Sequence, residues 1–292
     1  MRLQIAALAC LAAAMCAAAP DLNEPQNQAL NQAQKLYNHA EFESAIRVLS
    51  PTADQSASAL RLLGQSYFML GEYKKAVETL ERAVSLAPLD SDSYTWLGRA
   101  YGRRAETSFA ISAVGFANKS RANLEKAVQL NPANTEAVDD LFEYYVQAPG
   151  FLGGGFEKAS RLASQIARRD PAEGNYAKAR LAEQRKEYGT AEEHLRQAMA
   201  MAPQQVGRVL DLAKFLSKQG RYEEAESTFA HAQAVAPDAP KVMFARADTY
   251  IKSKRNIEMA RELLKRYLAS NLTPDDAPKT EALKLLKQAS GI

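Results

Sequence analysis

The stretch ASALRLLGQSYFMLGEYKKAVETLERAVSLAP, residues 57–88, decides the fold of this chain. Its apolar residues recur at spacings of three and four on both sides of Gly71, a pattern that predicts two amphipathic helices joined by a tight turn. Gly64 and Ala76 are small, so the two helices can approach closely. Gly71 can take the left-handed conformation that ends a helix, and Pro88 cannot continue the second one. Residues 57–88 therefore form one predicted helical hairpin.

The spacing of this hairpin recurs along the chain. An aromatic residue is followed by a small residue three positions later and by a proline about twelve positions after that. A self-similar unit of roughly 34 residues predicts a stack of helical hairpins, in which each unit packs on its neighbours. The pattern is carried by Tyr73, Ala76 and Pro88, by Phe156, Ala159 and Pro171, by Tyr188, Ala191 and Pro203, and by Tyr222, Ala225 and Pro237.

These residues closely resemble the tetratricopeptide repeat. The resemblance implies an all-α fold, a right-handed solenoid of about seven hairpins closed by a C-terminal capping helix. It also implies a surface that holds a protein or peptide partner. Further positions that match the repeat are Gly64, Gly98 and Gly220, together with Pro132. The expected units are residues 26–54, 57–90, 91–134, 135–171, 172–205, 206–239 and 240–274.

The N-terminal residues differ from the repeats. Residues 1–19 have an early arginine, an alanine-rich apolar run and small residues at the end, which is the layout of a secretory signal peptide. Both cysteines, Cys10 and Cys16, lie inside this segment, so we expect neither a disulfide nor a thiolate metal site in the exported chain. No later segment is long and apolar enough to predict a transmembrane span. We expect export to the periplasm, with secretion or a lipid anchor as alternatives.

The expected solenoid occupies residues 20–274, and residues 275–292 follow it. In the latter segment we expect Ala282, Leu283, Leu285 and Leu286 on one face of a helix, with lysines on the opposite face. This pattern predicts a helix that covers the apolar side of the last hairpin, as the exposed end of a solenoid requires.

Two intervals between the repeat prolines exceed the length of one unit. Pro88 and Pro132 are 44 residues apart, and Pro132 and Pro171 are 39 apart. The extra residues fall at 102–119 and 148–155, where we expect two inserted loops on the same edge of the solenoid. The first segment either folds back as a helical extension that packs on the second, or its apolar side chains contact a partner, because exposed apolar clusters mark interfaces. These residues are Phe109, Ile111 and Phe116 in the first segment and Phe151 and Leu152 in the second.

The concave groove is the second candidate surface. Its expected charges either pair within the array or orient an extended peptide. The combination of basic and amide residues with which some tetratricopeptide repeat proteins grip a C-terminal carboxylate is absent. The candidate groove residues are Arg61 and Gln65 of the second unit, Arg99 and Arg103 of the third, and Asp139 and Glu143 of the fourth.

No catalytic site, metal site or cofactor is expected. His39, His194 and His231 lie in different units, with no nucleophile spaced to work with them. The glycines at 153–155 lack the following Lys-Ser or Lys-Thr of a phosphate-binding loop. A net charge of +3, from 37 basic and 34 acidic residues, gives no reason to expect a nucleic acid partner.

The sequence therefore favours a non-catalytic scaffold or adaptor that holds a protein or peptide in its groove and by its inserted segments. One alternative is a subunit of a cell-envelope assembly, in outer-membrane, pilus or cytochrome biogenesis. A more remote alternative is a small-molecule-binding protein or an enzyme. The identity of the partner and the oligomeric state stay open.

Overall fold

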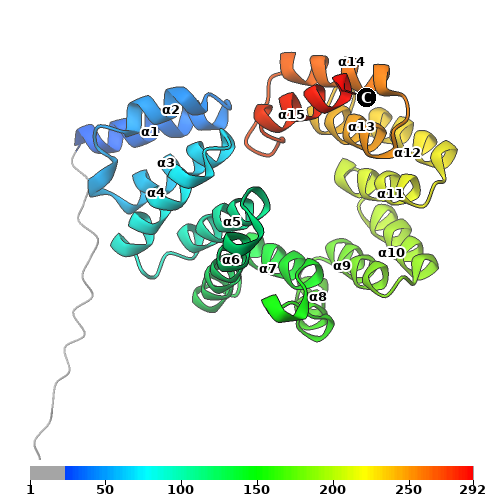
Figure 1. The fold of residues 1–292 in the computed structure, drawn as a ribbon, viewed down its shortest axis with the longest axis horizontal. Helices are drawn as coiled ribbons and strands as arrows, with labels where there is room; N and C mark the ends of the chain where they lie inside the picture. The colour runs from blue at the N-terminus through cyan, green and yellow to red at the C-terminus, as the bar shows by residue number, and fades with distance from the viewer. Residues whose placement is uncertain (1–23, 292) are drawn as a thin grey trace, which may run out of the picture.

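The computed structural model describes residues 24–291, and within them it contains fifteen α-helices and no β-strand. Successive helices pair into antiparallel hairpins (Figure 1). The helices are α1 (Glu24–Asn38), α2 (Phe42–Leu49), α3 (Ala57–Met69), α4 (Tyr73–Leu86), α5 (Ser91–Thr107), α6 (Ala110–Leu130), α7 (Thr135–Gln147), α8 (Phe156–Arg169), α9 (Pro171–Gln184), α10 (Tyr188–Met201), α11 (Val206–Lys218), α12 (Tyr222–Val235), α13 (Pro240–Ser253), α14 (Ile257–Ala269) and α15 (Lys279–Ser290). Two short 3-10 turns are η1 (Ala53–Gln55) and η2 (Gly150–Leu152).

The expected fold class, an all-α solenoid of helical hairpins with a C-terminal helix, is confirmed. Hairpins follow one another from α1–α2 to α13–α14, and α15 packs on α14 and α13. Ala282, Leu285 and Leu286 join the apolar cluster of those helices, whereas Leu283, expected on the same face, is exposed. The helical period explains the difference, because residues three, four and seven apart share a face and the next residue does not. The predicted signal peptide at residues 1–19 lies outside the described residues.

Close helix packing inside a hairpin depends on the small residues of the repeat. A Cβ atom added to Gly64 would lie 2.5 Å from Cγ of Leu80, and one added to Gly98 would lie 2.7 Å from Cγ of Leu124. Both leucines are buried. The facing helix therefore occupies the space that a side chain at these positions would need.

The turn inside five hairpins requires a left-handed residue. Gly71 and Gly220 have φ angles of +75° and +78°. Ala40, Lys186 and Lys254 stand at the same place in other hairpins and adopt φ angles of +56°, +62° and +55°. A left-handed conformation is costly for residues other than glycine, so the packed helices must impose it on these three turns.

Residues 102–119 do not form the expected loop but the alternative, a helical extension. These residues complete α5 and begin α6, so that only Ser108 and Phe109 connect the two helices. The segment contains no proline, and its extra residues lengthen both helices. The second insertion, residues 148–155, does connect two helices, since η2 and three glycines lie between α7 and α8.

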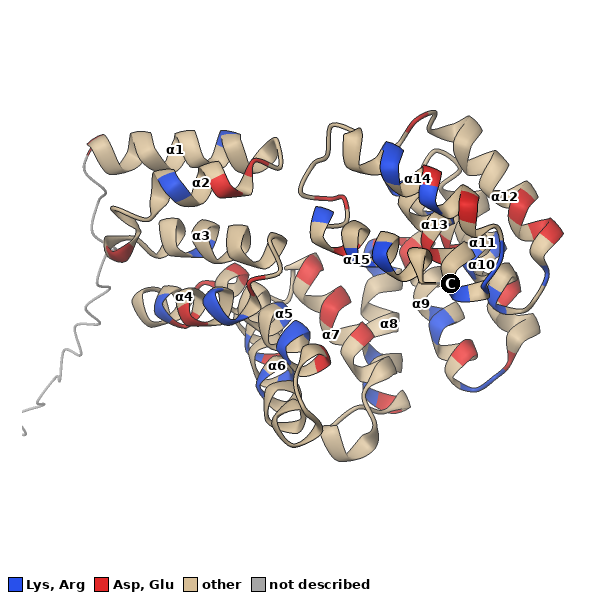
Figure 2. Cartoon of the chain, turned by 45° about the horizontal axis from the view of Figure 1, so that its top comes forward, with Lys and Arg blue, Asp and Glu red and all other residues tan. Residues whose placement is uncertain are grey.

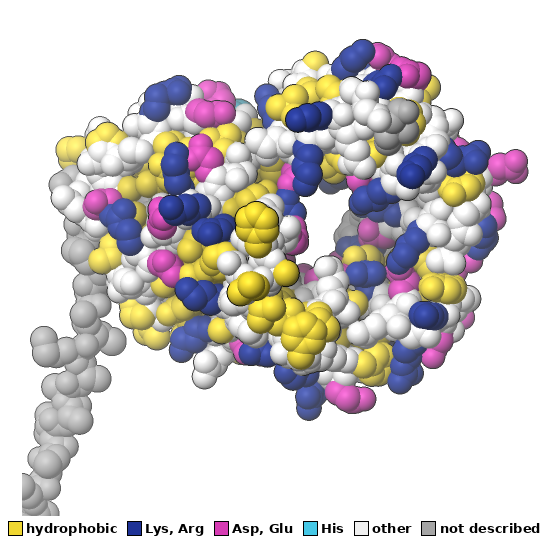
Figure 3. Space-filling model, viewed as in Figure 1, with side chains coloured by type: hydrophobic (Ala, Val, Ile, Leu, Met, Phe, Trp, Pro, Cys, Tyr) yellow, Lys and Arg dark blue, Asp and Glu magenta, His cyan; other side chains and the backbone are white. Residues whose placement is uncertain are grey.

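The stack of hairpins curves until its two ends meet (Figures 1 and 2). Glu281 at the start of α15 forms an ion pair with Arg103 of α5 and accepts a hydrogen bond of 3.4 Å from the hydroxyl of Tyr73. Thr280 lies beside Gly71, and Ala40 packs on the apolar cluster of the last hairpin. The C-terminal helix thus closes the solenoid onto its first three hairpins, and Figure 3 shows the central opening that results.

We predict opposite effects of alanine at two glycines. A Cβ atom at Gly174 would lie 2.4 Å from Cα of Ala167, a backbone atom of α8 that cannot turn aside. Gly174→Ala should lower the free energy of unfolding by about 1–3 kcal/mol. Gly115 lies inside α6 with nothing within 4 Å, so Gly115→Ala should raise it by about 0.5–1 kcal/mol. Urea denaturation followed by circular dichroism measures both, and equal effects of the two substitutions would contradict the packing described.

A second prediction concerns ring closure. The side chains of Arg103 and Glu281 are 29% and 27% exposed, so the pair itself contributes only about 1 kcal/mol or less. Glu281→Arg replaces this attraction by repulsion and should shift the solenoid toward an open form with a larger radius of gyration in small-angle X-ray scattering. Adding Arg103→Glu to that variant should restore the closed form. Identical scattering from the wild type and Glu281→Arg would show that this contact does not hold the ring closed.

Candidate functional site

The first helices of the first four hairpins line a hollow of about 910 Å³ on the inside of the curve. Residues separated by one repeat length recur in its wall, because equivalent positions of stacked hairpins face the same side. Asn31, Gln65 and Arg99 form one such row. Pro274 and Asp275, from the connection before α15, complete the wall. Other lining residues are Leu30, Gln34 and Tyr37 of α1, Ser58, Arg61 and Leu62 of α3, Asp92, Thr95 and Trp96 of α5, and Asn131, Ala133, Asn134, Thr135 and Glu136 around the start of α7.

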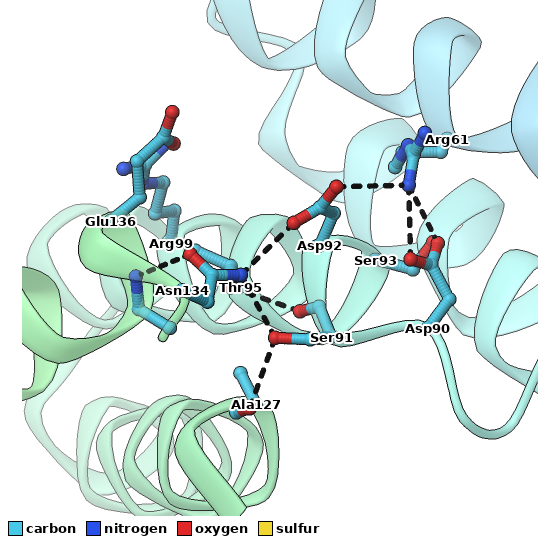
Figure 4. A network of polar contacts seen from close by, with 11 residues as sticks. Arg61, Asp90, Ser91, Asp92, Ser93, Thr95, Arg99, Ala127, Asn134 and Glu136 are labelled. Atoms are coloured by element: carbon cyan, nitrogen blue, oxygen red, sulfur yellow. Dashed lines mark hydrogen bonds and ion pairs between the residues drawn. The ribbon is translucent and has the colours of Figure 1, made fainter. Parts of the chain in front are cut away.

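A network of polar contacts connects α3, the start of α5 and Asn134 in the wall of this hollow (Figure 4). The guanidinium of Arg61 donates to both carboxylate oxygens of Asp90, at 3.0 and 2.8 Å, and lies 3.4 Å from Asp92. The amide nitrogen of Asn134 donates to the hydroxyl of Ser91 at 2.8 Å and to Asp92 at 2.9 Å. The hydroxyl of Ser91 in turn donates to the carbonyl of Ala127. Three successive hairpins are therefore joined through side chains at the groove.

Arg99 lies in the same wall, between Trp96 and Glu136. Its guanidinium contacts Asp140 and Glu136, the latter at 2.8 Å, and lies 4.7 Å from the ring centre of Trp96. Burial raises the pKa of the Asp140 carboxyl above its ordinary value, and the charge of Arg99 limits the rise. The positive charge of Arg99 is thus already matched by two acids, and the wall carries no net cationic site at this position.

Two amides of the row are not used by the fold. Neither Asn31 nor Gln65 has a side-chain hydrogen-bond partner among residues 24–291, although both line the hollow. A primary amide can donate and accept at once, which matches the peptide backbone. Together with the flat indole of Trp96 and the ring of Tyr37, these amides give the hollow the chemistry to hold an extended chain.

A second hollow, of about 590 Å³, follows along the inner surface between α7 and α13. Glu143 accepts hydrogen bonds from Arg180, at 3.1 and 3.2 Å, and from the hydroxyl of Tyr176 at 3.2 Å. Lysines from α11 and α13 line the same hollow, namely Lys214, Lys218 and Lys252. Two of these lysines are paired, Lys218 with Glu183 at 2.7 Å and Lys252 with Asp248 at 2.6 Å, so the second hollow also carries mainly paired charges.

The structure separates some residues that were expected to share one groove. Arg61, Gln65 and Arg99 lie together in the first hollow, whereas Glu143 lines the second. Arg103 lines neither hollow, because it belongs to the ring closure with Tyr73 and Glu281.

The expected groove position of Asp139 is wrong. It lines neither hollow and instead pairs with Arg169 of α8 at 3.0 Å. Its neighbour Asp140 is the acid that reaches Arg99.

The apolar residues of the two inserted segments differ in their exposure to solvent. Phe109, Ile111 and Phe151 are exposed, whereas Phe116 stacks on Tyr101 with 6.0 Å between ring centres. Leu152 is partly buried, and its carbonyl accepts hydrogen bonds from Arg121 at 3.1 Å and Tyr144 at 2.9 Å.

Several groove residues were missed by sequence reasoning. Asn31 and Gln34 belong to the degenerate first unit, but a shift of one repeat length from Gln65 would have found Asn31. No sequence signal could have found Pro274 and Asp275, because they reach the hollow only through ring closure.

Residues 24–291 contain no group of three or more His, Cys, Asp or Glu side chains arranged to hold a metal ion. No helix in the same range combines the length and the apolar character needed to cross a membrane.

Comparisons with known proteins agree with the geometry. Residues 26–88 and residues 182–242 each match a tetratricopeptide repeat family. A segment of 89 residues is 36% identical to the rhomboid protease GluP of Bacillus subtilis (strain 168) and covers 28% of this chain. It spans only 18% of the length of that protease.

Two solved structures have the same fold. A tetratricopeptide repeat protein from Parabacteroides merdae aligns over 91% of this chain and 99% of its own, with a TM-score of 0.58 and 14% identity. A thermophilic protein of the same kind from Thermus thermophilus aligns over 69% and 98%, with a TM-score of 0.52 and 20% identity. At these identities the likeness concerns the fold alone.

A third prediction tests the network around Asn134. The side-chain oxygen of Asn134 caps α7 by accepting from the backbone N–H of Ala137 at 3.1 Å. Asn134→Ala removes this cap and should cost about 1 kcal/mol. Asn134→Asp keeps the cap but sets a carboxylate against Asp92, so the variant should be destabilised near neutral pH and recover as protonation relieves the repulsion at acid pH.

Thermal melts at neutral and acid pH, compared with the wild type at each pH, provide the measurement. A deficit of Asn134→Asp that does not change with pH would contradict the contact with Asp92.

Proposed function

We propose that this chain, of which residues 26–88 and 182–242 match a tetratricopeptide repeat family, is an adaptor that holds an extended segment of a partner protein in the hollow lined by α1, α3, α5 and α7. Tetratricopeptide repeat domains in general mediate protein interactions. The observation that carries the proposal is the pair of unengaged amides, Asn31 and Gln65, beside Trp96. Asn31 is exposed and Gln65 is half-buried, so both amides are accessible to a chain that enters the hollow.

The charges of the hollow suggest the kind of segment that fits. Arg61 and Arg99 are each paired with acids of the protein, so a strongly anionic or cationic peptide would have to displace an existing ion pair. A segment of low charge, recognised through its backbone and by stacking on Trp96, keeps these pairs intact. We therefore propose an uncharged, extended stretch of polypeptide as the ligand.

We further propose that the protein is exported, on the basis of the residue pattern at 1–19. The second candidate function is a subunit of a cell-envelope assembly built on the same scaffold. The exposed side chains of Phe109, Ile111 and Phe151 favour it, because they lie outside the groove and leave room for a second contact. Co-purification with a membrane complex from the native source would distinguish this role from that of a free adaptor.

The groove proposal has a direct test, because Trp96 is the only tryptophan of the chain. Peptides selected on the protein by phage display should change the emission of Trp96 when titrated. Gln65→Ala removes a potential ligand contact without breaking a hydrogen bond of the fold, and should weaken binding about five- to tenfold.

The matched control is Gln129→Ala, on the exposed side of α6 and outside both hollows. This substitution should leave binding unchanged. The groove proposal fails if selected peptides bind without any change in Trp96 emission, or if Gln65→Ala and Gln129→Ala bind alike.

A further inference from the structure

An exposed apolar stripe lies at the start of α6 and on η2; we call it the apolar edge and define it as Phe109, Ile111, Val114 and Phe151. The side chains of Phe109, Ile111 and Phe151 are 92%, 94% and 79% exposed. Figure 3 shows hydrophobic side chains gathered on one face of the ring beside the central opening. Side chains this exposed contribute little to the stability of the fold. A cluster of them marks a surface that contacts another molecule.

The sequence around this stripe is unusual for a surface. Residues 107–118, which span the end of α5 and the start of α6, carry no charged side chain. Other exposed large hydrophobic residues, such as Met201 of α10 and Met259 of α14, stand singly on different elements. The apolar edge is therefore a local feature of the third and fourth hairpins rather than a general property of the surface.

Three cations flank the apolar edge without an acidic partner. Arg104 lies 4.4 Å from the ring centre of Phe116, and Lys119 donates to the hydroxyl of Tyr101 at 3.2 Å. Lys158 donates to the carbonyl of Gly153 at 2.9 Å. None of the three forms an ion pair with a carboxylate among residues 24–291, whereas the groove arginines do. The contacts of Arg104 and Lys158 thus include no carboxylate, whereas the hydroxyl that Lys119 contacts also donates to Glu81.

We propose that the apolar edge docks the ring onto an anionic lipid bilayer. Phe109, Ile111 and Phe151 enter the boundary between headgroups and acyl chains, and Arg104, Lys119 and Lys158 contact lipid phosphates. Apolar side chains flanked by basic residues are the combination by which proteins bind membrane surfaces without spanning them.

A bilayer fits these observations better than a second copy of the chain. A stable protein interface buries about 800 Å² on each partner and needs a matching surface, whereas the apolar edge offers four side chains. A second copy would also bring the same three cations into the contact, where they would repel. Lipid headgroups adapt to a small protrusion and supply the missing negative charge.

The test uses brominated lipids, which quench a nearby tryptophan. In a full chain that carries Trp96→Phe and Phe109→Trp, so that position 109 holds its one tryptophan, emission should fall when vesicles of phosphatidylcholine and brominated phosphatidylglycerol are added. The matched control is Leu89→Trp in the same Trp96→Phe background, because Leu89 is also exposed and lies just before the opposite end of α5; its emission should not be quenched. Because this readout is specific to one position, membrane binding by residues 1–23 does not produce it.

Two further variants separate the apolar and the charged contributions. Ile111→Ser with Phe151→Ser should lower vesicle partitioning of the Phe109→Trp chain by about tenfold or more. Replacing Arg104 and Lys158 by glutamine should lower it roughly fivefold for each charge. Vesicles of phosphatidylcholine alone should bind weakly.

Several outcomes would overturn the proposal. Equal quenching at positions 109 and 89, or equal binding to neutral and anionic vesicles, would show that the apolar edge does not select an anionic membrane. If the wild type were a dimer by light scattering and the serine substitutions made it monomeric without changing vesicle binding, the occupant would be a second copy. Binding to a protein partner that these substitutions abolish, with no quenching at 109, would assign the apolar edge to that partner.

Discussion

The close approach of two helices across a small residue is the constraint on which this structure depends. Gly64 against Leu80 and Gly98 against Leu124 leave no room for another carbon atom. This distance fixes the angle within each hairpin, and the left-handed turn residues follow from it even where they are lysine or alanine. Stacking hairpins of one shape gives a constant curvature. The groove and the closed ring are both consequences of that repetition.

Much of the fold could be predicted from residue spacing, because each hairpin is held by local contacts. The periodic apolar positions around Gly71 and Gly220 indicate helices and turns without knowledge of the rest of the chain. The segment 102–119 was expected to be a loop because the proline interval revealed extra residues but not their conformation. It is helical because nothing in it breaks a helix. The spacing of the repeat prolines shows how many extra residues a unit contains. The helix propensity of those residues decides whether they form a loop or lengthen the helices.

The candidate site was less predictable, since it depends on which charges meet. The repeat positions brought Arg61, Gln65 and Arg99 to one hollow. They did not distinguish Asp139 from Asp140, whose neighbouring side chains point about a quarter-turn apart on α7. They also gave no sign that Arg103 meets Glu281, 178 residues further along the chain. Contacts at such separation arise from the accumulated curvature of all seven hairpins, and small errors in each unit would add up.

Ring closure has a mechanical consequence. An open solenoid is flexible along its length, because small changes at each joint between hairpins add up from one end to the other. A contact between Glu281 and Arg103 joins the two ends of the solenoid. Stretching of the coil along its axis is then opposed by this ion pair and by the contacts of Thr280 and Ala40 at the seam. These contacts add to the stiffness that the joints between hairpins provide.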